Sequence, residues 1–281
     1  MTSRRFTDLV GCTVPVQLAA MGGVGTTELA SAVASAGGLG MVPAGTQPAQ
    51  GACGVNFLVP FAPSLDDIVA SASQSRVVEF FYADPRADFV AAAHRAGAVA
   101  GWQVGSAAEA LAAEMVGCDY VVAQGTEAGG HVRGTQGLDD LLAQVRSSVR
   151  IPIVAAGGIA TAERTAAIVR AGADAVRVGT RFVTSPESGA HPEYVRMLLA
   201  ATGDDTVLTE WFSDGWPNAP HRVLQSSVAA AEKTGWKATV PPYRGIDRDP
   251  RDMAMYAGRG VGDVNRSRPA AEVVADLVRL L

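Results

Sequence analysis

The chain alternates between short apolar runs and longer segments in which apolar residues recur with helical spacing. Eight short apolar runs rich in valine begin at Val14, Gly38, Cys53, Arg76, Ala98, Asp119, Ile151 and Asp174. Several runs are apolar at successive positions, which is typical of strands in a parallel sheet covered by helices. The pattern therefore predicts eight parallel strands with helices between them.

The intervening segments carry helix start and stop signals. Ser64 with Asp67, and Ser106 with Glu109, have the spacing of capping boxes, and the sequences "HRAG", "EMVG" and "VRAG" each end on a glycine suited to the left-handed conformation. Eight such units can close into a (β/α)8 TIM barrel, and a doubly wound open sheet is the alternative. The count of eight favours the barrel.

The alternation of apolar runs and helical segments ends after Phe182. A helix is expected around "PEYVRMLLAATG", then a short run "DTVLTEWF", a loop-rich tail and a final helix. The apolar residues expected on one face of that last helix are Val273, Val274, Leu277, Leu280 and Leu281. We expect residues 1–185 to form the barrel core and residues 186–281 an extension that packs on it and completes the cover of the active site.

Composition and charge narrow the possible partners. Of 281 residues, 48% are hydrophobic and 18% charged, which is typical of a globular protein. The net charge of −5, with scattered lysines and arginines, argues against a nucleic-acid partner. Cys12, Cys53 and Cys118 lack the CxxC spacing of a metal or redox site, so we expect small core residues in a reducing cytoplasm. We find no signal-peptide pattern and no uninterrupted apolar stretch long enough to span a membrane.

Glycine-rich loops follow the last two predicted strands. Gly157 and Gly158 come after the seventh strand, and Gly179 and Thr180 after the eighth. Loops at these positions of a barrel commonly bind phosphate through backbone N–H groups. The alternative is that these glycines only allow tight turns. Because the two loops occur together, we expect a phosphate-bearing ligand.

Four amide side chains interrupt or end the apolar strands: Gln17, Asn56, Gln103 and Gln124. A buried amide without partners costs about 1–3 kcal/mol, so each needs a hydrogen-bonding role. They either satisfy loop backbone or face a ligand with several donors and acceptors, such as an isoalloxazine ring. For Asn56 and Gln124, near strand ends, we favour the ligand; the role of Gln17 stays open.

The sequence "EAGGH" places His131 directly after two glycines. With an ordinary pKa of about 6.5, a histidine there can take a proton from carbon or, when protonated, bind an anion. The alternative is a loop histidine that hydrogen-bonds a carbonyl group. His221, in the tail, receives no assigned role.

Five segments, in order, resemble the nitronate monooxygenases: "AAMGGVGTTELASAVASAGGLGMV", "GVNFLVP", "AQGTEAGGH", "IPIVAAGGI" and "VRVGTRF". A weaker match lies at "MYAGRGVGDV". The resemblance implies an FMN-dependent barrel, with FMN bound by residues 1–185, that oxidises nitronates or nitroalkanes with dioxygen to carbonyl compounds and nitrite. It also implies that His131 is the active-site histidine. The cofactor-binding residues would be Ala20, Met21, Gly22, Asn56, Gln103, Gln124, Gly129, Gly157, Gly158, Arg177, Gly179 and Thr180. No metal is expected, and the protein is a possible homodimer.

Two arginines depart from the family pattern. Arg177 and Arg259 stand where relatives often have glutamine; Arg177 would add a charge-assisted contact to phosphate or point to solvent. These two replacements bear on the identity of the substrate more than on the binding of the flavin. Two other functions therefore stay open: an FMN-dependent enoyl-acyl-carrier-protein reductase that uses NAD(P)H, and a non-catalytic flavin-binding or sensor protein.

Overall fold

The computed structural model describes residues 4–48 and 50–281, and this part of the chain contains a closed barrel. Its eight parallel strands are β1 (Val16–Leu18), β2 (Gly40–Pro43), β3 (Cys53–Leu58), β4 (Val77–Phe81), β5 (Val99–Val104), β6 (Tyr120–Gln124), β8 (Ile153–Ala156) and β9 (Ala175–Val178). They pair in the order β1-β9-β8-β6-β5-β4-β3-β2, and a parallel bridge between Gln17 and Leu39 joins the two ends. The predicted (β/α)8 barrel is confirmed, because eight parallel strands form one sheet whose two ends are joined. Each strand lies within one of the predicted apolar runs.

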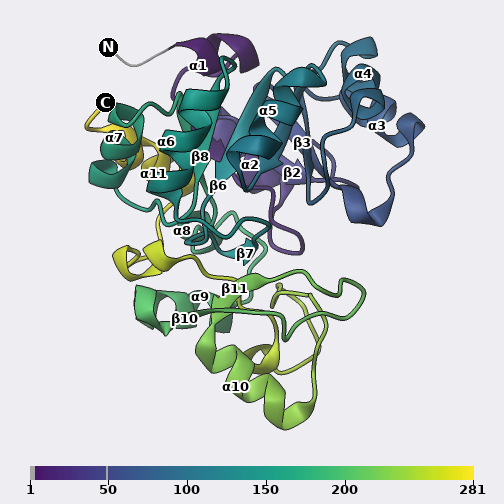
Figure 1. Ribbon diagram of the computed structural model, residues 1–281. Coiled ribbons are helices and arrows are strands. Elements are labelled where there is room, and N and C mark those ends of the chain that lie inside the picture. The colour runs from purple at the N-terminus through teal and green to yellow at the C-terminus, as the bar shows by residue number, and fades with distance from the viewer. Residues whose placement is uncertain (1–3, 49) are drawn as a thin grey trace.

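Helices surround the barrel (Figure 1). They are α2 (Thr27–Ser35), α3 (Leu65–Ala72), α4 (Ala87–Arg95), α5 (Ala107–Met115), α6 (Leu138–Ser148), α7 (Ala162–Arg170), the short α8 (Thr180–Val183) and α11 (Ala270–Val278). The last of these, α11, packs against α2 and α7, and its Val273, Val274 and Leu277 belong to the barrel core. The prediction for Leu280 and Leu281 is wrong: they lie beyond the end of the helix and are 49% and 42% exposed.

The predicted helix ends are largely as expected. Ser64 and Asp67 form a complete capping box at α3. Ser106 accepts from the backbone of Glu109, but the Glu109 carboxylate bonds Gly105 and Arg133 instead of completing a box. The Glu109 carboxylate turns to Arg133 because a hydrogen bond between opposite charges is stronger than one to a neutral backbone N–H group. The three predicted terminal glycines, Gly97, Gly117 and Gly172, have positive φ.

The amino-terminal end of the barrel is plugged by α1 (Arg5–Val10). Phe6 and Val10 are fully buried among residues that begin strands, including Tyr120 at the start of β6. The rings of Phe6 and Tyr120 meet edge to face at 5.3 Å. Because this end is closed, the carboxyl ends of the strands form the accessible end of the barrel.

The remaining elements lie at the opposite end from α1 (Figure 1). They are β7 (Gly130–His131), α9 (Pro192–Ala200), β10 (Thr206–Thr209), β11 (His221–Leu224) and α10 (Gln225–Thr234), with 3-10 turns at Val59–Phe61, Gly203–Asp205, Pro250–Asp252 and Arg259–Asp263. The strands β10, β11 and β7 form a small antiparallel sheet, so β7 ties the loop after β6 to the extension. The division of the chain at residue 185 stays a prediction; within the tail, α11 packs on the barrel's helical layer against α2 and α7, and the turn Arg259–Asp263 packs against α8.

Candidate active site

A cavity of about 380 Å³ lies at the carboxyl ends of the barrel strands. This volume is within the range of small-molecule and cofactor sites, about 300–1,000 Å³. All thirteen predicted site residues line it: His131, Ala20, Met21, Gly22, Asn56, Gln103, Gln124, Gly129, Gly157, Gly158, Arg177, Gly179 and Thr180. The structure thus gathers segments from six parts of the sequence around one space, although the role of each residue stays a prediction.

A buried carboxylate organises the floor of this cavity. Glu79, on β4, is fully buried and accepts hydrogen bonds from Asn56 (3.0 Å), Gln17 (3.1 Å) and the Tyr120 hydroxyl (2.7 Å). It also forms an ion pair with Arg177. The buried amides of Gln17 and Asn56 therefore find one of their partners within the protein. Sequence analysis missed Glu79, although a carboxylate inside the apolar run "VVEFF" was the available signal.

Arg177 is held from three sides inside the barrel. Besides the ion pair with Glu79, its Nε donates to Gln17 Oε1 (3.2 Å) and its Nη1 to Gln103 Oε1 (2.6 Å). The possibility that it points to solvent is wrong, because the side chain is buried against these partners. Burying an ion costs several kcal/mol unless it is paired and hydrogen-bonded, and Arg177 meets both conditions.

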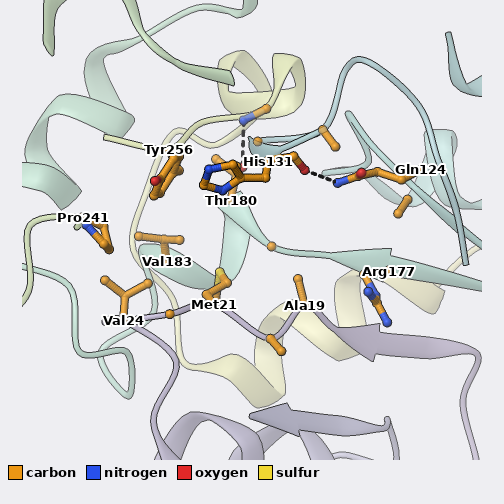
Figure 2. Close-up of a pocket in the computed structure, with 18 of the residues that line it drawn as sticks. Ala19, Met21, Val24, Gln124, His131, Arg177, Thr180, Val183, Pro241 and Tyr256 are labelled. Carbon is orange, nitrogen blue, oxygen red and sulfur yellow. Dashed lines mark hydrogen bonds between the residues drawn. The ribbon is translucent and has the colours of Figure 1, made fainter. Parts of the chain in front are cut away.

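Gln124 connects the cavity to the loop that carries His131. Its Nε2 donates to the backbone carbonyl of His131 at 3.0 Å, drawn as a dashed line in Figure 2. Its Oε1 is buried and has no hydrogen-bond partner among the described residues. Since an unsatisfied buried acceptor is costly, this oxygen is available to a ligand in the cavity.

Glycine backbone forms one wall of the cavity. Gly157 and Gly158 have φ of +124° and +66°, which other residues rarely adopt. A Cβ on Gly129 would lie 2.6 Å from the nitrogen of Gly258, which donates to the Thr180 hydroxyl (3.0 Å; Figure 2). Only glycine fits such a close approach, and the concave backbone wall suits the phosphate-bearing end of a cofactor.

The His131 imidazole is enclosed by aromatic rings. The Trp216 ring stacks on it with a centroid distance of 3.9 Å, and those of His221 and Tyr256 lie at 5.0 and 5.7 Å. Its Nε2 is buried with no partner among the described residues. Burial, with a smaller contribution from His221, lowers the pKa of His131 to about 3. The imidazole is therefore neutral at pH 7 and carries no charge with which to hold an anion.

His221 lies directly opposite His131 where β11 pairs with β7. Its Nδ1 bonds the carbonyl of Ala219 at 2.9 Å, and its Nε2 accepts from the backbone N–H of Phe212 at 3.3 Å. Burial lowers its pKa as well. A neutral tautomer with Nδ1 protonated satisfies both bonds, so His221 supports the strand that presents His131.

The extension supplies cavity residues that sequence analysis did not assign, namely Tyr194, Trp216, Thr239, Val240, Pro241, Tyr256, Gly258 and Gly260. Tyr194 lies on α9, and the others lie in loops and short elements without a strand or helix period. The one signal was the match at "MYAGRGVGDV", which contains Tyr256, Gly258 and Gly260. Arg259 lies in the same segment but pairs with Asp204 at the surface (3.0 Å).

Within residues 4–48 and 50–281, no cluster of three or more His, Cys, Asp or Glu side chains is arranged to bind a metal ion. None of the helices in this part of the chain combines the length and apolar character needed to cross a membrane. The three cysteines are buried, as expected of core residues.

The fold and the cavity define a (β/α)8-barrel enzyme with its site at the strand carboxyl ends. The family model for nitronate monooxygenase matches residues 52–279, and the chain belongs to the nitronate monooxygenase family. It is accordingly an oxidoreductase, and the family implies a flavoprotein.

Two relatives illustrate the similarity. The nitronate monooxygenase of Pseudomonas aeruginosa is 30% identical, with 99% of each chain covered. A Mycobacterium tuberculosis (3aS,4S,5R,7aS)-5-hydroxy-7a-methyl-1-oxo-octahydro-1H-indene-4-carboxyl-CoA dehydrogenase is 32% identical over 83% of this chain. The chain spans 69% of the length of that protein. It spans 64% of a putative monooxygenase from the same organism and 66% of the Rhodococcus jostii protein that carries the same dehydrogenase name.

Two solved structures are similar over nearly the whole chain. FabK from Thermotoga maritima is 29% identical with a TM-score of 0.85, covering 99% of this chain and 95% of that one. Nitroalkane oxidase from Streptomyces ansochromogenes is 29% identical with a TM-score of 0.78, covering 98% and 97%.

Proposed function

We propose that the chain binds FMN in this cavity and oxidises nitronates with dioxygen. In the balanced reaction, two nitronate anions and one dioxygen yield two carbonyl compounds and two nitrite ions. The observation that carries the proposal is a pair of buried polar atoms that have no partner among the described residues, Gln124 Oε1 and His131 Nε2, in residues that line one cavity. Family membership supports the same reaction.

The residues present fit FMN. The glycine wall exposes backbone to the cavity at close packing, since a Cβ on Gly129 would lie 2.6 Å from the nitrogen of Gly258, and Gln124 offers an acceptor that has no partner among the described residues. The proposed contacts are backbone of Ala20, Met21 and Gly22 along the flavin; the amides of Asn56, Gln103 and Gln124, with Arg177, at its polar rim; and Gly129, Gly157, Gly158, Gly179 and Thr180 at the phosphate. When bound, FMN supplies the redox chemistry, and the chain positions the substrate and excludes water.

We assign His131 the role of a neutral hydrogen-bonding group. In the tautomer with a proton on Nε2, the imidazole donates to a nitronate oxygen. A pKa of about 3 makes it a weak proton acceptor at pH 7. The enzyme therefore uses the preformed nitronate, so that no carbon–hydrogen bond needs to be broken by His131.

An anaerobic titration tests this function. The purified protein is loaded with FMN, and the nitronate of nitroethane is added without oxygen. We expect loss of the oxidised flavin absorbance with nitronate alone, at least tenfold slower in His131→Ala and unchanged in His94→Ala, a histidine outside the cavity. A flavin spectrum that nitronate leaves unchanged would rule out the proposal.

The similarity to FabK fits a second function, an NAD(P)H-dependent enoyl-acyl-carrier-protein reductase. The same titration separates the two functions. Loss of absorbance with NADPH but not with nitronate would favour the reductase, and no change with either donor would favour a non-catalytic flavin-binding protein. The family match and the nitronate monooxygenase relatives favour the first function.

A further inference from the structure

A second cleft lies in the helical layer of the barrel, where α7, α8 and α11 meet. Its volume is about 480 Å³, and of the described residues that line it none also lines the active-site cavity. The helices α7 and α11 lie side by side there (Figure 1), and α8 also packs against α11. The space is large enough to hold a small molecule.

Arginine side chains dominate the lining of this cleft. They are Arg181 on α8, Arg266 and Arg268 in the segment before α11, and Arg279 at the end of α11. The acidic side chains that line it are Glu163, Asp263 and Asp276. The cleft therefore carries an excess of positive charge, although the whole chain has a net charge of −5.

One carboxylate, that of Asp276, serves three of these arginines. Asp276 lies 2.6 Å from Arg181 Nη2 and 3.2 Å from Arg279 Nε. Arg268 Nη1 is 3.9 Å from the same carboxylate, which is too long for a hydrogen bond. Arg266 is exposed and forms no ion pair among the described residues. Since each guanidinium group has five N–H donors, unused donors remain around the cleft.

Arg181 connects the cleft to the wall of the active-site cavity. It follows Thr180, and its guanidinium donates to the carbonyl group of Ala160; Thr180 and Ala160 both line the active-site cavity. The two spaces thus lie on neighbouring residues of the same two segments. A phosphate probe has two possible sites in this part of the molecule, and a binding experiment has to separate them.

We propose that this cleft binds a small molecule that carries more than one phosphate group. Planar guanidinium groups bind phosphate oxygens in pairs, and arginines from α8, α11 and the segment between them can reach a diphosphate from more than one side. The diphosphate supplies the negative charge that Asp276 alone does not. The inference does not depend on the reaction proposed for the active-site cavity.

Calorimetric titration with inorganic diphosphate at pH 7 and low ionic strength tests the inference. We expect one saturable site on the FMN-loaded protein, with a Kd that rises as sodium chloride is added, because the cleft is open to solvent. The same Kd is expected for the protein without FMN. No saturable binding would overturn the inference. Binding that FMN abolishes would overturn it as well, because the diphosphate would then occupy the active-site cavity.

Variants of the cleft distinguish a ligand site from a purely structural cluster. Arg266→Gln/Arg268→Gln is expected to weaken diphosphate binding at least tenfold. The control is Arg196→Gln, an exposed arginine on α9 that does not line the cleft. An equal Kd for the double variant and the control would contradict the assignment.

Asp276→Asn is expected to act in the opposite direction. Removing this carboxylate releases guanidinium groups that it now pairs, so diphosphate is expected to bind at least threefold more tightly, even if the variant is less stable. A cluster that only holds α11 in place would lose stability without gaining affinity. Unchanged or weaker diphosphate binding by Asp276→Asn would therefore overturn the inference.

The source of the diphosphate group is distinguished by comparing three ligands. Tighter binding of adenosine 5′-diphosphate than of inorganic diphosphate would identify a nucleotide, and the reverse order would identify the inorganic ion. Adenosine, which has no phosphate, is expected not to bind. Binding of adenosine as tight as that of its diphosphate would contradict recognition through phosphate.

Discussion

Two buried side chains, Glu79 and Arg177, determine the polar floor of the cavity. Three neutral groups and Arg177 satisfy the Glu79 carboxylate, and both charged side chains are buried. Replacing one ion leaves the other buried without its counter-charge, which is far more costly than breaking a surface pair. The floor is therefore sensitive to single substitutions but tolerant of a matched neutral pair.

Arg177→Gln is expected to lower the free energy of unfolding by about 3–5 kcal/mol, because it leaves Glu79 unpaired. The double variant Glu79→Gln/Arg177→Gln is expected to recover most of that loss. Urea unfolding at pH 7 measures both, with Arg196→Gln as a control for an exposed ion pair. A loss no larger than the control's would contradict a structural role for the buried pair.

The pH dependence of stability tests the environment of His131. Its pKa is about 3 in the folded chain and ordinarily about 6.5, so the unfolded chain binds more protons between these values. Stability from the neutral imidazole is complete above pH 6.5 and is lost as the pH falls towards 3. We expect wild-type stability to fall more steeply there than that of His131→Asn, by up to about 1.4 kcal/mol per pH unit. Parallel profiles would show that His131 titrates normally.

The same pKa predicts which form of the substrate reacts. A weakly basic His131 does not remove a proton from a neutral nitroalkane at a useful rate, whereas a nitronate needs no such step. We expect kcat/KM for the nitronate of nitroethane to exceed that for freshly dissolved nitroethane at least a hundredfold at pH 7. Comparable values, measured as initial nitrite formation, would assign proton abstraction to the active site.

Among the elements, α11 completes the ring of helices around the barrel. The helix comes from the end of the sequence but packs between α2 and α7, next to β1. Leu277 is fully buried there, while Leu280 lies beyond the helix at the surface. The chain therefore inserts its extension before the last helix of the ring instead of adding it after a finished barrel.

Leu277→Ala is expected to destabilise the protein by about 2–5 kcal/mol, because it leaves a cavity in the barrel core. Leu280→Ala, the same change three residues later, is expected to alter stability by less than about 0.5 kcal/mol. Thermal and urea unfolding of both variants check this. Equal effects would mean that α11 does not contribute to the core.

The elements differ in how well the sequence predicts them. Each barrel strand is a buried apolar run, so burial on both faces leaves a clear signal at Val77–Phe81 or Tyr120–Gln124. Loop glycines 157 and 158 were predictable because their backbone conformation demands glycine. Trp216 was not predictable, because it reaches the cavity through long-range packing of an irregular segment, and Tyr256 was indicated only by the weaker match at "MYAGRGVGDV". Glu79 was missed because its partners come from four other strands.

At the scale of the whole molecule, both the barrel and its extension contribute residues to the cavity. The barrel supplies the strand-end amides and glycines, and the extension covers the open end and contributes Trp216 and Tyr256 (Figure 1). The pairing of β7 with β11 joins the two at His131. Changes in the extension are therefore expected to alter substrate preference while the cofactor contacts from the barrel persist.

Nitrite formation in air, from the nitronate of nitroethane and with no nicotinamide present, tests the proposed activity most directly. The FMN-loaded protein is expected to release nitrite and acetaldehyde in equal amounts, with turnover reduced at least tenfold by His131→Ala. No nitrite, together with NADPH-dependent reduction of an enoyl thioester by the same preparation, would contradict nitronate oxidation and assign the cavity to the reductase.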